Sequence, residues 1–252
     1  MKFYKEVEFM FYEEYGSREL PTIIMLHGGG VVHSFFNQYI LSNRFHLVIP
    51  HLYGNGRESH VQYDPIENVK AIAKIINKIG KNKVSIVGFS IGAQITIPLL
   101  CNFEHLFSKA IMISPWLIKS EKTLKKFSKL AALTYPMYKS KLLMKLQLKT
   151  LGLNELQLNE CISYFQVMKK ENLLAFWNNG INICDYPEFI NIQIPMLAIT
   201  GKKEIPDMAK SVKYLGEVNP NCKVEIWENY NHNIPFKNPE RLNKTIVDFL
   251  SS

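Results

Sequence analysis

The chain has 252 residues, of which 47% are hydrophobic and 21% are charged. This composition is typical of a globular protein and excludes a disordered or fibrous one. No apolar run reaches the ~18–20 residues that a membrane-spanning helix needs, and the N-terminus lacks the apolar stretch of a signal peptide. The formal net charge of +8 is unusual, and it raises nucleic acids, anionic lipid surfaces and acidic substrates as partners.

Short runs rich in Val and Ile, each bounded by turn residues, predict six buried parallel strands at 22–26, 47–50, 84–88, 109–114, 196–201 and 223–227. Ahead of them, Val7, Phe9 and Phe11 alternate with Glu8, Met10 and Tyr12, which predicts an antiparallel edge strand.

Helix signals stand between the strands. Asp64 is a predicted N-cap, Pro65 suits the first helical position, and Glu67 is expected to complete a capping box. Asn238-Pro239-Glu240 predicts the start of a C-terminal helix. The alternation of strand and helix predicts an α/β fold, with a mostly parallel central sheet and helices on both faces.

The alternation stops in the middle of the chain. Residues 117–190 contain several helical stretches and no clear strand, and Asn154 with Gln157 is a candidate helix cap. We interpret this segment as a helical insertion within one domain, because no repeat or linker-like run borders it.

The sharpest local motif is Gly88-Phe89-Ser90-Ile91-Gly92, which follows the strand at 84–88 and precedes a helical run. A serine on such a tight strand-to-helix turn is exposed and lies at a helix N-terminus, which favours developing negative charge. A second motif, His27-Gly28-Gly29-Gly30, follows the strand at 22–26. Its glycines let backbone N–H groups approach a reacting oxygen.

With these motifs the chain resembles the α/β-hydrolase family over nearly its whole length. The resemblance rests on HGGG at 27–30, VIPHLYGNGRES at 48–59, GFSIG at 88–92, ITGKKE at 199–204 and NYNHNIP at 229–235. It implies a core of residues 1–116 and 191–252, with 117–190 as a helical cap over the active site. It also implies an oxyanion hole formed by the N–H groups of Ile91 and Gly29, with Gly30 as a third donor.

The family's order of serine, acid and histidine assigns the remaining catalytic residues. Only His105 and His232 follow Ser90, and His105 precedes the strand at 109–114, so His232 is the expected base. Glu204, in Gly201-Lys202-Lys203-Glu204, takes the place of the family's usual aspartate, and Asp207 is the alternative. The family's other acid position, after Ser114, offers only the distant Glu121.

These roles imply a serine hydrolase that cleaves carboxylic esters with a small or medium apolar acyl group through an acyl-enzyme. No metal or organic cofactor is expected. The same residues also suit a thioesterase, acyltransferase, lactonase or C–C bond hydrolase, and a slow ligand receptor of the same fold is a further alternative. The four cysteines are Cys101, Cys161, Cys184 and Cys222. They form no Cys-x-x-Cys pair, which fits a cytoplasmic protein.

The predicted cap carries eight apolar and aromatic residues that are expected to pack it onto the core or to line an acyl pocket: Phe127, Leu130, Tyr135, Tyr138, Leu143, Tyr164, Phe165 and Phe176. Its segment from Lys119 to Lys149 holds nine lysines and one acid, Glu121, which equals the whole net charge. Arginines and nucleic-acid motifs are missing there, so we expect no nucleic-acid partner. The remaining interpretations are solvated helix faces, the attraction of anionic substrates to the cap, and a weak contact with an anionic membrane surface.

Overall fold

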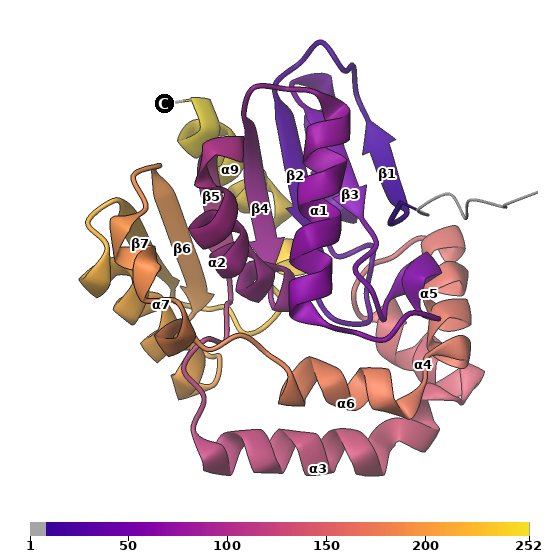
Figure 1. The fold of residues 1–252 in the computed structure, drawn as a ribbon. Helices are drawn as coiled ribbons and strands as arrows, with labels where there is room; N and C mark the ends of the chain where they lie inside the picture. Colours follow the sequence, from indigo (N-terminus) through magenta and orange to yellow (C-terminus); the bar gives the residue numbers. More distant parts are fainter. Residues whose placement is uncertain (1–8, 252) are drawn as a thin grey trace, which may run out of the picture.

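A computed structural model describes residues 9–251, and a seven-stranded sheet forms its centre (Figure 1). The strand order is β1-β3-β2-β4-β5-β6-β7, and every neighbouring pair is parallel except β1 with β3. The strands are β1 (Tyr12–Tyr15), β2 (Thr22–Leu26), β3 (His46–Pro50), β4 (Val84–Phe89), β5 (Phe107–Ile113), β6 (Met196–Gly201) and β7 (Cys222–Trp227). All six predicted parallel strands are confirmed to within two residues at each end.

Side chains of the buried strands alternate between two apolar cores. Ile24 and Leu26 of β2 join the first core, whereas Ile23 and Met25 join the second. The first core also contains α1 (Pro65–Ile79), α2 (Ile91–Phe103) and α7 (Pro206–Val218). The second contains α9 (Pro239–Ser251) and a 3-10 helix at Phe36–Asn43. Helices therefore cover both faces of a mostly parallel sheet, which confirms the predicted fold class.

The edge strand lies later in the chain than predicted. Val7 falls outside the described residues, and Phe9 and Phe11 precede β1, which begins at Tyr12. Tyr12 pairs with Pro50, where β3 ends, so the residues before Tyr12 have passed the end of their partner strand. The Phe11 carbonyl still accepts from the His51 N–H at 2.9 Å, but the Phe11 N–H donates to the Glu58 carboxylate, at 2.7 Å.

One of the two predicted helix caps is only half formed. The Asp64 carboxylate accepts from the N–H groups of Ile66 and Glu67, as predicted. The Glu67 side chain does not complete the box, because it pairs with Lys70 one turn further on, at 2.8 Å. The second cap is confirmed, since Asn154 and Gln157 form a reciprocal capping box at the start of α5 (Glu155–Val167).

Four helices follow β5 and precede β6: α3 (Glu121–Tyr138), α4 (Lys141–Lys149), α5 and α6 (Lys170–Asn178). They lie beyond the carboxyl ends of the parallel strands (Figure 1). The first apolar core continues into them through Ala131, Met144 and Phe165. The division into a core of 1–116 and 191–252 and a cap of 117–190 stays a prediction.

The remaining helical turns are short. They are α8 (Ile234–Lys237) and 3-10 turns at Gly56–Glu58, Glu104–Leu106, Ile183–Asp185 and Pro187–Asn191. Among residues 9–251, none of the helices combines the length and apolarity needed to cross a bilayer. The cytoplasmic location stays a prediction.

Candidate active site

Ser90 occupies a strained turn between β4 and α2. Its φ of 55° and ψ of −115° lie where L residues are rare. The two flanking glycines make this turn possible because the chain is tightly packed there. A Cβ on Gly92 would lie 2.1 Å from the Leu26 carbonyl oxygen, and one on Gly88 would lie 2.6 Å from the Gly92 oxygen. The GxSxG spacing is thus a steric requirement of the turn that presents Ser90.

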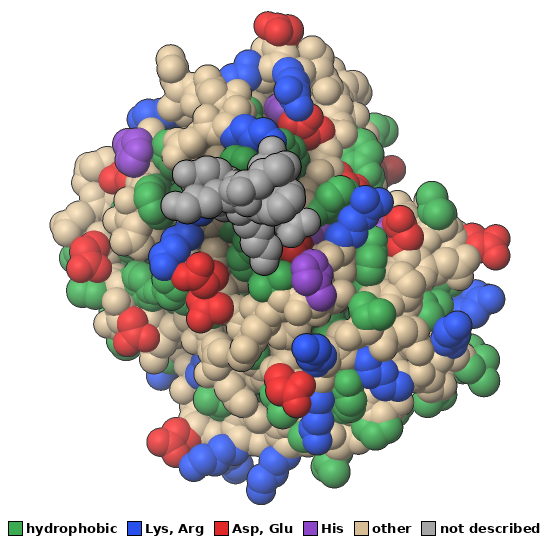
Figure 2. Space-filling model, turned by 45° about the vertical axis from the view of Figure 1, so that its right-hand side comes forward, with side chains coloured by type: hydrophobic (Ala, Val, Ile, Leu, Met, Phe, Trp, Pro, Cys, Tyr) green, Lys and Arg blue, Asp and Glu red, His purple; other side chains and the backbone are tan. Residues whose placement is uncertain are grey.

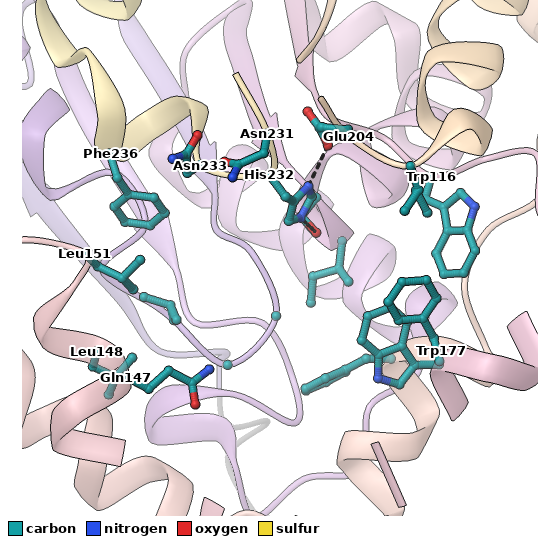
Figure 3. A pocket seen from close by; sticks show the side chains of 18 of the residues that line it. Trp116, Gln147, Leu148, Leu151, Trp177, Glu204, Asn231, His232, Asn233 and Phe236 are labelled. Carbon is teal, nitrogen blue, oxygen red and sulfur yellow. Dashed lines mark hydrogen bonds and ion pairs between the residues drawn. The ribbon is translucent and has the colours of Figure 1, made fainter. Parts of the chain in front are cut away.

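A continuous chain of hydrogen bonds joins Ser90, His232 and Glu204. The His232 Nε2 lies 2.9 Å from Ser90 Oγ, and its Nδ1 lies 2.8 Å from Glu204 Oε2 (the dashed line in Figure 3). The Phe89 ring stacks on the imidazole at a centroid distance of 5.0 Å. The His232 side chain is 41% exposed, whereas that of Glu204 is 1% exposed. The acid therefore lies beneath a histidine that remains open to a substrate.

The second oxygen of Glu204 is held by the ends of two strands. Glu204 Oε1 accepts from Ser114 Oγ at 2.6 Å and from the Gly201 N–H at 2.8 Å. Burial raises the pKa of this carboxyl, but the hydrogen bonds from His232, Ser114 and Gly201 outweigh burial and hold the pKa below its ordinary value. Glu204 is therefore ionised and can only accept from Nδ1, which leaves His232 Nε2 to accept the Ser90 proton.

Ser114 was not predicted as part of the site. It directly follows β5, has a positive φ of 53°, and donates its backbone N–H to the Ile199 carbonyl. The sequence could have pointed to Ser114, because the family's other acid position lies at the end of this strand. In this chain the position contributes a hydroxyl that orients Glu204. Glu121 is distant from the site and pairs with Lys125 on α3.

Asp207, the alternative acid, lies in the first turn of α7 and faces a different element. Its carboxylate accepts from the N–H of Ser120 at 3.0 Å and from the Ser120 hydroxyl at 3.2 Å. Ser120 is the N-cap of α3. Asp207 therefore fastens the start of α3, and the geometry favours Glu204 as the partner of His232.

Two of the three predicted oxyanion donors are available. Gly29 and Ile91 both line the pocket beside Ser90, and a Cβ on Gly29 would lie 3.6 Å from the Ile91 side chain. Within residues 9–251 neither of their N–H groups has an acceptor. The prediction for Gly30 is corrected, because its N–H donates to the buried Asn55 Oδ1 at 2.7 Å. Gly30 instead shapes the loop, with a φ of +77°.

A pocket of about 960 Å³ opens above Ser90. Of the eight predicted cap residues, Phe127, Tyr138, Phe165 and Phe176 line it. Leu130 and Leu143 are exposed instead, at 48% and 40%. Three further aromatics that were not predicted also line it, from separate segments: Trp116 and Trp177 on one side and Phe236 on the other (Figure 3). The result is a largely aromatic and aliphatic chamber with the Ser90–His232 pair in its wall.

The other two predicted cap aromatics have structural contacts. The Tyr135 hydroxyl donates to the Met168 carbonyl at 3.1 Å, and the Tyr164 ring packs edge-on against His51. Residues 9–251 contain no cluster of three or more His, Cys, Asp or Glu side chains placed to bind a metal ion.

A family model described as alpha/beta hydrolase fold matches residues 21–239. The chain belongs to the α/β-hydrolase fold family. The match spans the glycine loop, the serine turn, helices α3–α6 and the His232 loop. A search of curated proteins finds no match to this α/β hydrolase. Family and fold agree on a hydrolase enzyme.

Solved structures resemble this hydrolase along almost its whole length. An esterase from Exiguobacterium antarcticum superposes with a TM-score of 0.79 at 17% identity, covering 96% of both chains. A structure from a study of Nitrososphaera gargenis carboxylesterases gives 0.77 at 17%, covering 96% of this chain and 94% of the other. The enol-lactonase from Burkholderia xenovorans gives 0.76 at 17%, covering 96% of both. Identities this low establish the shared fold alone.

The Glu204 carboxyl is expected to make the free energy of unfolding depend on pH on the acid side. Its pKa is 4.5 in an unfolded chain and lower in the folded one. The contribution is fully present above pH 4.5 and is lost as the pH falls through the folded pKa, because the unfolded state binds the proton more readily in that window. Glu204→Gln should flatten this part of the curve, measured by urea unfolding between about pH 3 and pH 7. Identical pH dependence in both proteins would contradict it.

Proposed function

We propose that this α/β hydrolase cleaves carboxylic esters with a small or medium apolar acyl group. The observation that carries the proposal is the chain of hydrogen bonds from Ser90 through His232 to Glu204, which opens into an apolar pocket of about 960 Å³. A pocket of this size and lining suits an acyl chain, and the small-molecule acyl substrate is the expected partner.

The reaction follows from the roles that the geometry allows. His232 Nε2 takes the Ser90 proton as Oγ attacks the carbonyl carbon, and the N–H groups of Gly29 and Ile91 hold the oxyanion. The imidazolium then protonates the leaving alkoxide, which departs and leaves an acyl group on Ser90. A water molecule gives its proton to His232 and attacks the acyl carbon, and the collapse returns that proton to Ser90 and releases the acid. Glu204 stays ionised and holds the imidazole tautomer throughout.

A chain-length series tests the substrate class. With p-nitrophenyl esters, each methylene buried in the pocket is worth about 0.8 kcal/mol, so kcat/KM should rise roughly fourfold per methylene beyond acetate until the pocket is full. A profile that is flat or falls from acetate onwards contradicts the apolar acyl pocket. A higher kcat/KM for a thioester with the same acyl group contradicts ester specificity in favour of a thioesterase.

A fluorophosphonate probe tests the nucleophile separately from turnover. Ser90 should be the labelled residue in a peptide map, because the probe reacts with a serine hydroxyl that a neighbouring histidine activates. Failure to label rejects the serine-hydrolase mechanism. Rapid labelling without turnover of any ester contradicts the esterase proposal and favours a transferase or a ligand receptor.

A further inference from the structure

Helix α4 arranges its side chains in four stripes, each following the i, i+4 spacing of a helix. Lys141, Lys145 and Lys149 form an exposed lysine stripe. Leu142 and Leu146 form the next stripe and are 67% and 59% exposed. The third stripe is Leu143 with Gln147, and the fourth is Met144 with Leu148.

The last two stripes lead into the pocket. Met144 and Leu148 are buried and line it, and the exposed Gln147 lines it at the surface. Going around α4, the surface thus passes from lysine to exposed leucine and then to the pocket wall. An apolar molecule that reaches Leu142 and Leu146 is therefore one helix face away from the chamber above Ser90.

The preceding helix α3 packs against α4 and also exposes apolar side chains. Leu130, Leu133 and Met137 on its outer side are 48%, 78% and 47% exposed. Lysines stand on the same side of the helix, one to two turns nearer its N-terminus. We call the combined surface the α3–α4 face, made of Lys122, Lys126, Lys129, Leu130, Leu133, Met137, Lys141, Leu142, Lys145, Leu146 and Lys149. In Figure 2, blue and green side chains intermingle over the lower right of the molecule, towards the region of these helices.

Most of the lysines in the segment from Lys119 to Lys149 face the solvent. Among the nine lysines between 119 and 149, Lys119 donates to the Ile181 carbonyl at 2.8 Å, and Lys139 donates to the Gln166 carbonyl at 2.7 Å. The other seven are exposed, and the segment's single acid, Glu121, pairs with Lys125. Interspersed leucines and uncompensated lysines suit a surface that is both anionic and apolar, whereas nucleic acid offers phosphates but no place for exposed leucines.

We propose that the α3–α4 face docks on an anionic lipid bilayer, with lysines at the headgroups and leucines in the acyl boundary. This inference rests on the proposed function, because it names the source of the ester. The substrate is then a lipid-borne ester, and its acyl chain passes from the bilayer over Leu142 and Leu146 to Gln147 and into the pocket. Docking supplies substrate at the pocket mouth without any further binding site.

Vesicle co-sedimentation tests the docking. Purified Ser90→Ala protein should sediment with phosphatidylglycerol-containing vesicles at low salt, and much less with pure phosphatidylcholine vesicles or at high salt. Changing Lys141, Lys145 and Lys149 together to Gln should weaken the partition coefficient on the order of a hundredfold. The matched control changes to Gln the three lysines Lys70, Lys74 and Lys78 on α1, which have the same spacing and are likewise exposed. Both triple variants lower the net charge of +8 by three. If the α3–α4 face is the docking site, only the α4 variant should lose vesicle binding.

A second variant tests the contribution of the exposed leucines to docking. Leu142→Ser with Leu146→Ser should reduce sedimentation at least tenfold in the same assay, because the two side chains enter the acyl boundary. In a protein with Ser90 intact it should leave turnover of a soluble p-nitrophenyl ester unchanged, which also shows that it folds.

Three results overturn the docking proposal: no sedimentation with anionic vesicles at low salt, equal loss in the α1 control, or no effect of the leucine pair. Since binding is measured with Ser90→Ala, a failed esterase assay beside intact vesicle binding would reject the proposed function and leave the docking in place.

Discussion

Changing Ser90 to alanine is expected to lower kcat for ester hydrolysis by roughly 10⁴- to 10⁶-fold, with little change in KM. The hydroxyl accounts for the whole nucleophilic route, because Oγ both attacks the carbonyl and donates its proton to His232, 2.9 Å away. The pocket walls and the oxyanion donors remain in the variant, so the substrate should still bind. Rates of p-nitrophenyl butyrate hydrolysis, measured with the steady-state constants separated, check the expectation.

The control for Ser90 lies on β4, the strand that precedes its turn. Ser85 in β4 contacts the Ser108 hydroxyl at 3.0 Å, and its side chain takes no part in the pocket. Ser85→Ala should retain near-normal kcat. A Ser90→Ala protein that keeps more than about a tenth of the activity would rule out Ser90 as the nucleophile, since another group would then carry the reaction.

Glu204→Gln is expected to lower kcat by about 10⁴-fold. A glutamine fills the same space and can still accept from Ser114 and Gly201 through its oxygen. Its amide group, however, would donate to His232 Nδ1. The imidazole hydrogen then moves to Nε2, which can no longer accept the Ser90 proton. The loss should appear in kcat rather than KM, because the Glu204 side chain is only 1% exposed and acts through His232.

Asp207→Asn provides the matched comparison, since it also replaces one carboxylate with its amide. Asp207 holds Ser120 at the start of α3, so the variant should lose some thermal stability and change kcat by only a few-fold. If Asp207→Asn shows the larger fall in kcat, the assignment of Glu204 as the acid is wrong.

Local sequence features predicted the buried strands well, because each is a run of Val and Ile too short for a helix and bounded by turns. The edge strand was harder to place. Its alternating pattern extends further than its partner, and only the end of β3 at Pro50 decides where pairing begins. The capping box at Glu67 failed for a local reason, because Lys70, three residues further along the same helix, binds the carboxylate.

Some residues of the candidate site could likewise be identified from the sequence, whereas others depended on the fold. Ser90 was identifiable because the two glycines that its turn requires lie within five consecutive residues. The choice between Glu204 and Asp207 depended on which carboxylate the neighbouring strand ends hold next to His232. Although the two residues are only three positions apart, Glu204 contacts His232 and Asp207 contacts Ser120. The Ser114 hydroxyl and the engagement of the Gly30 N–H by Asn55 are likewise contacts between distant segments.

The sequence by itself therefore determined the α/β fold class, the nucleophile turn and the concentration of positive charge in one segment, since each is a property of adjacent residues. Only the tertiary structure decided which carboxylate faces His232, which backbone N–H groups stay open, which aromatics enclose the pocket, and which of the nine lysines face outward. Each of these depends on distances between residues far apart in the chain. Such distances arise when the strands align and helices α3–α6 pack beyond their carboxyl ends.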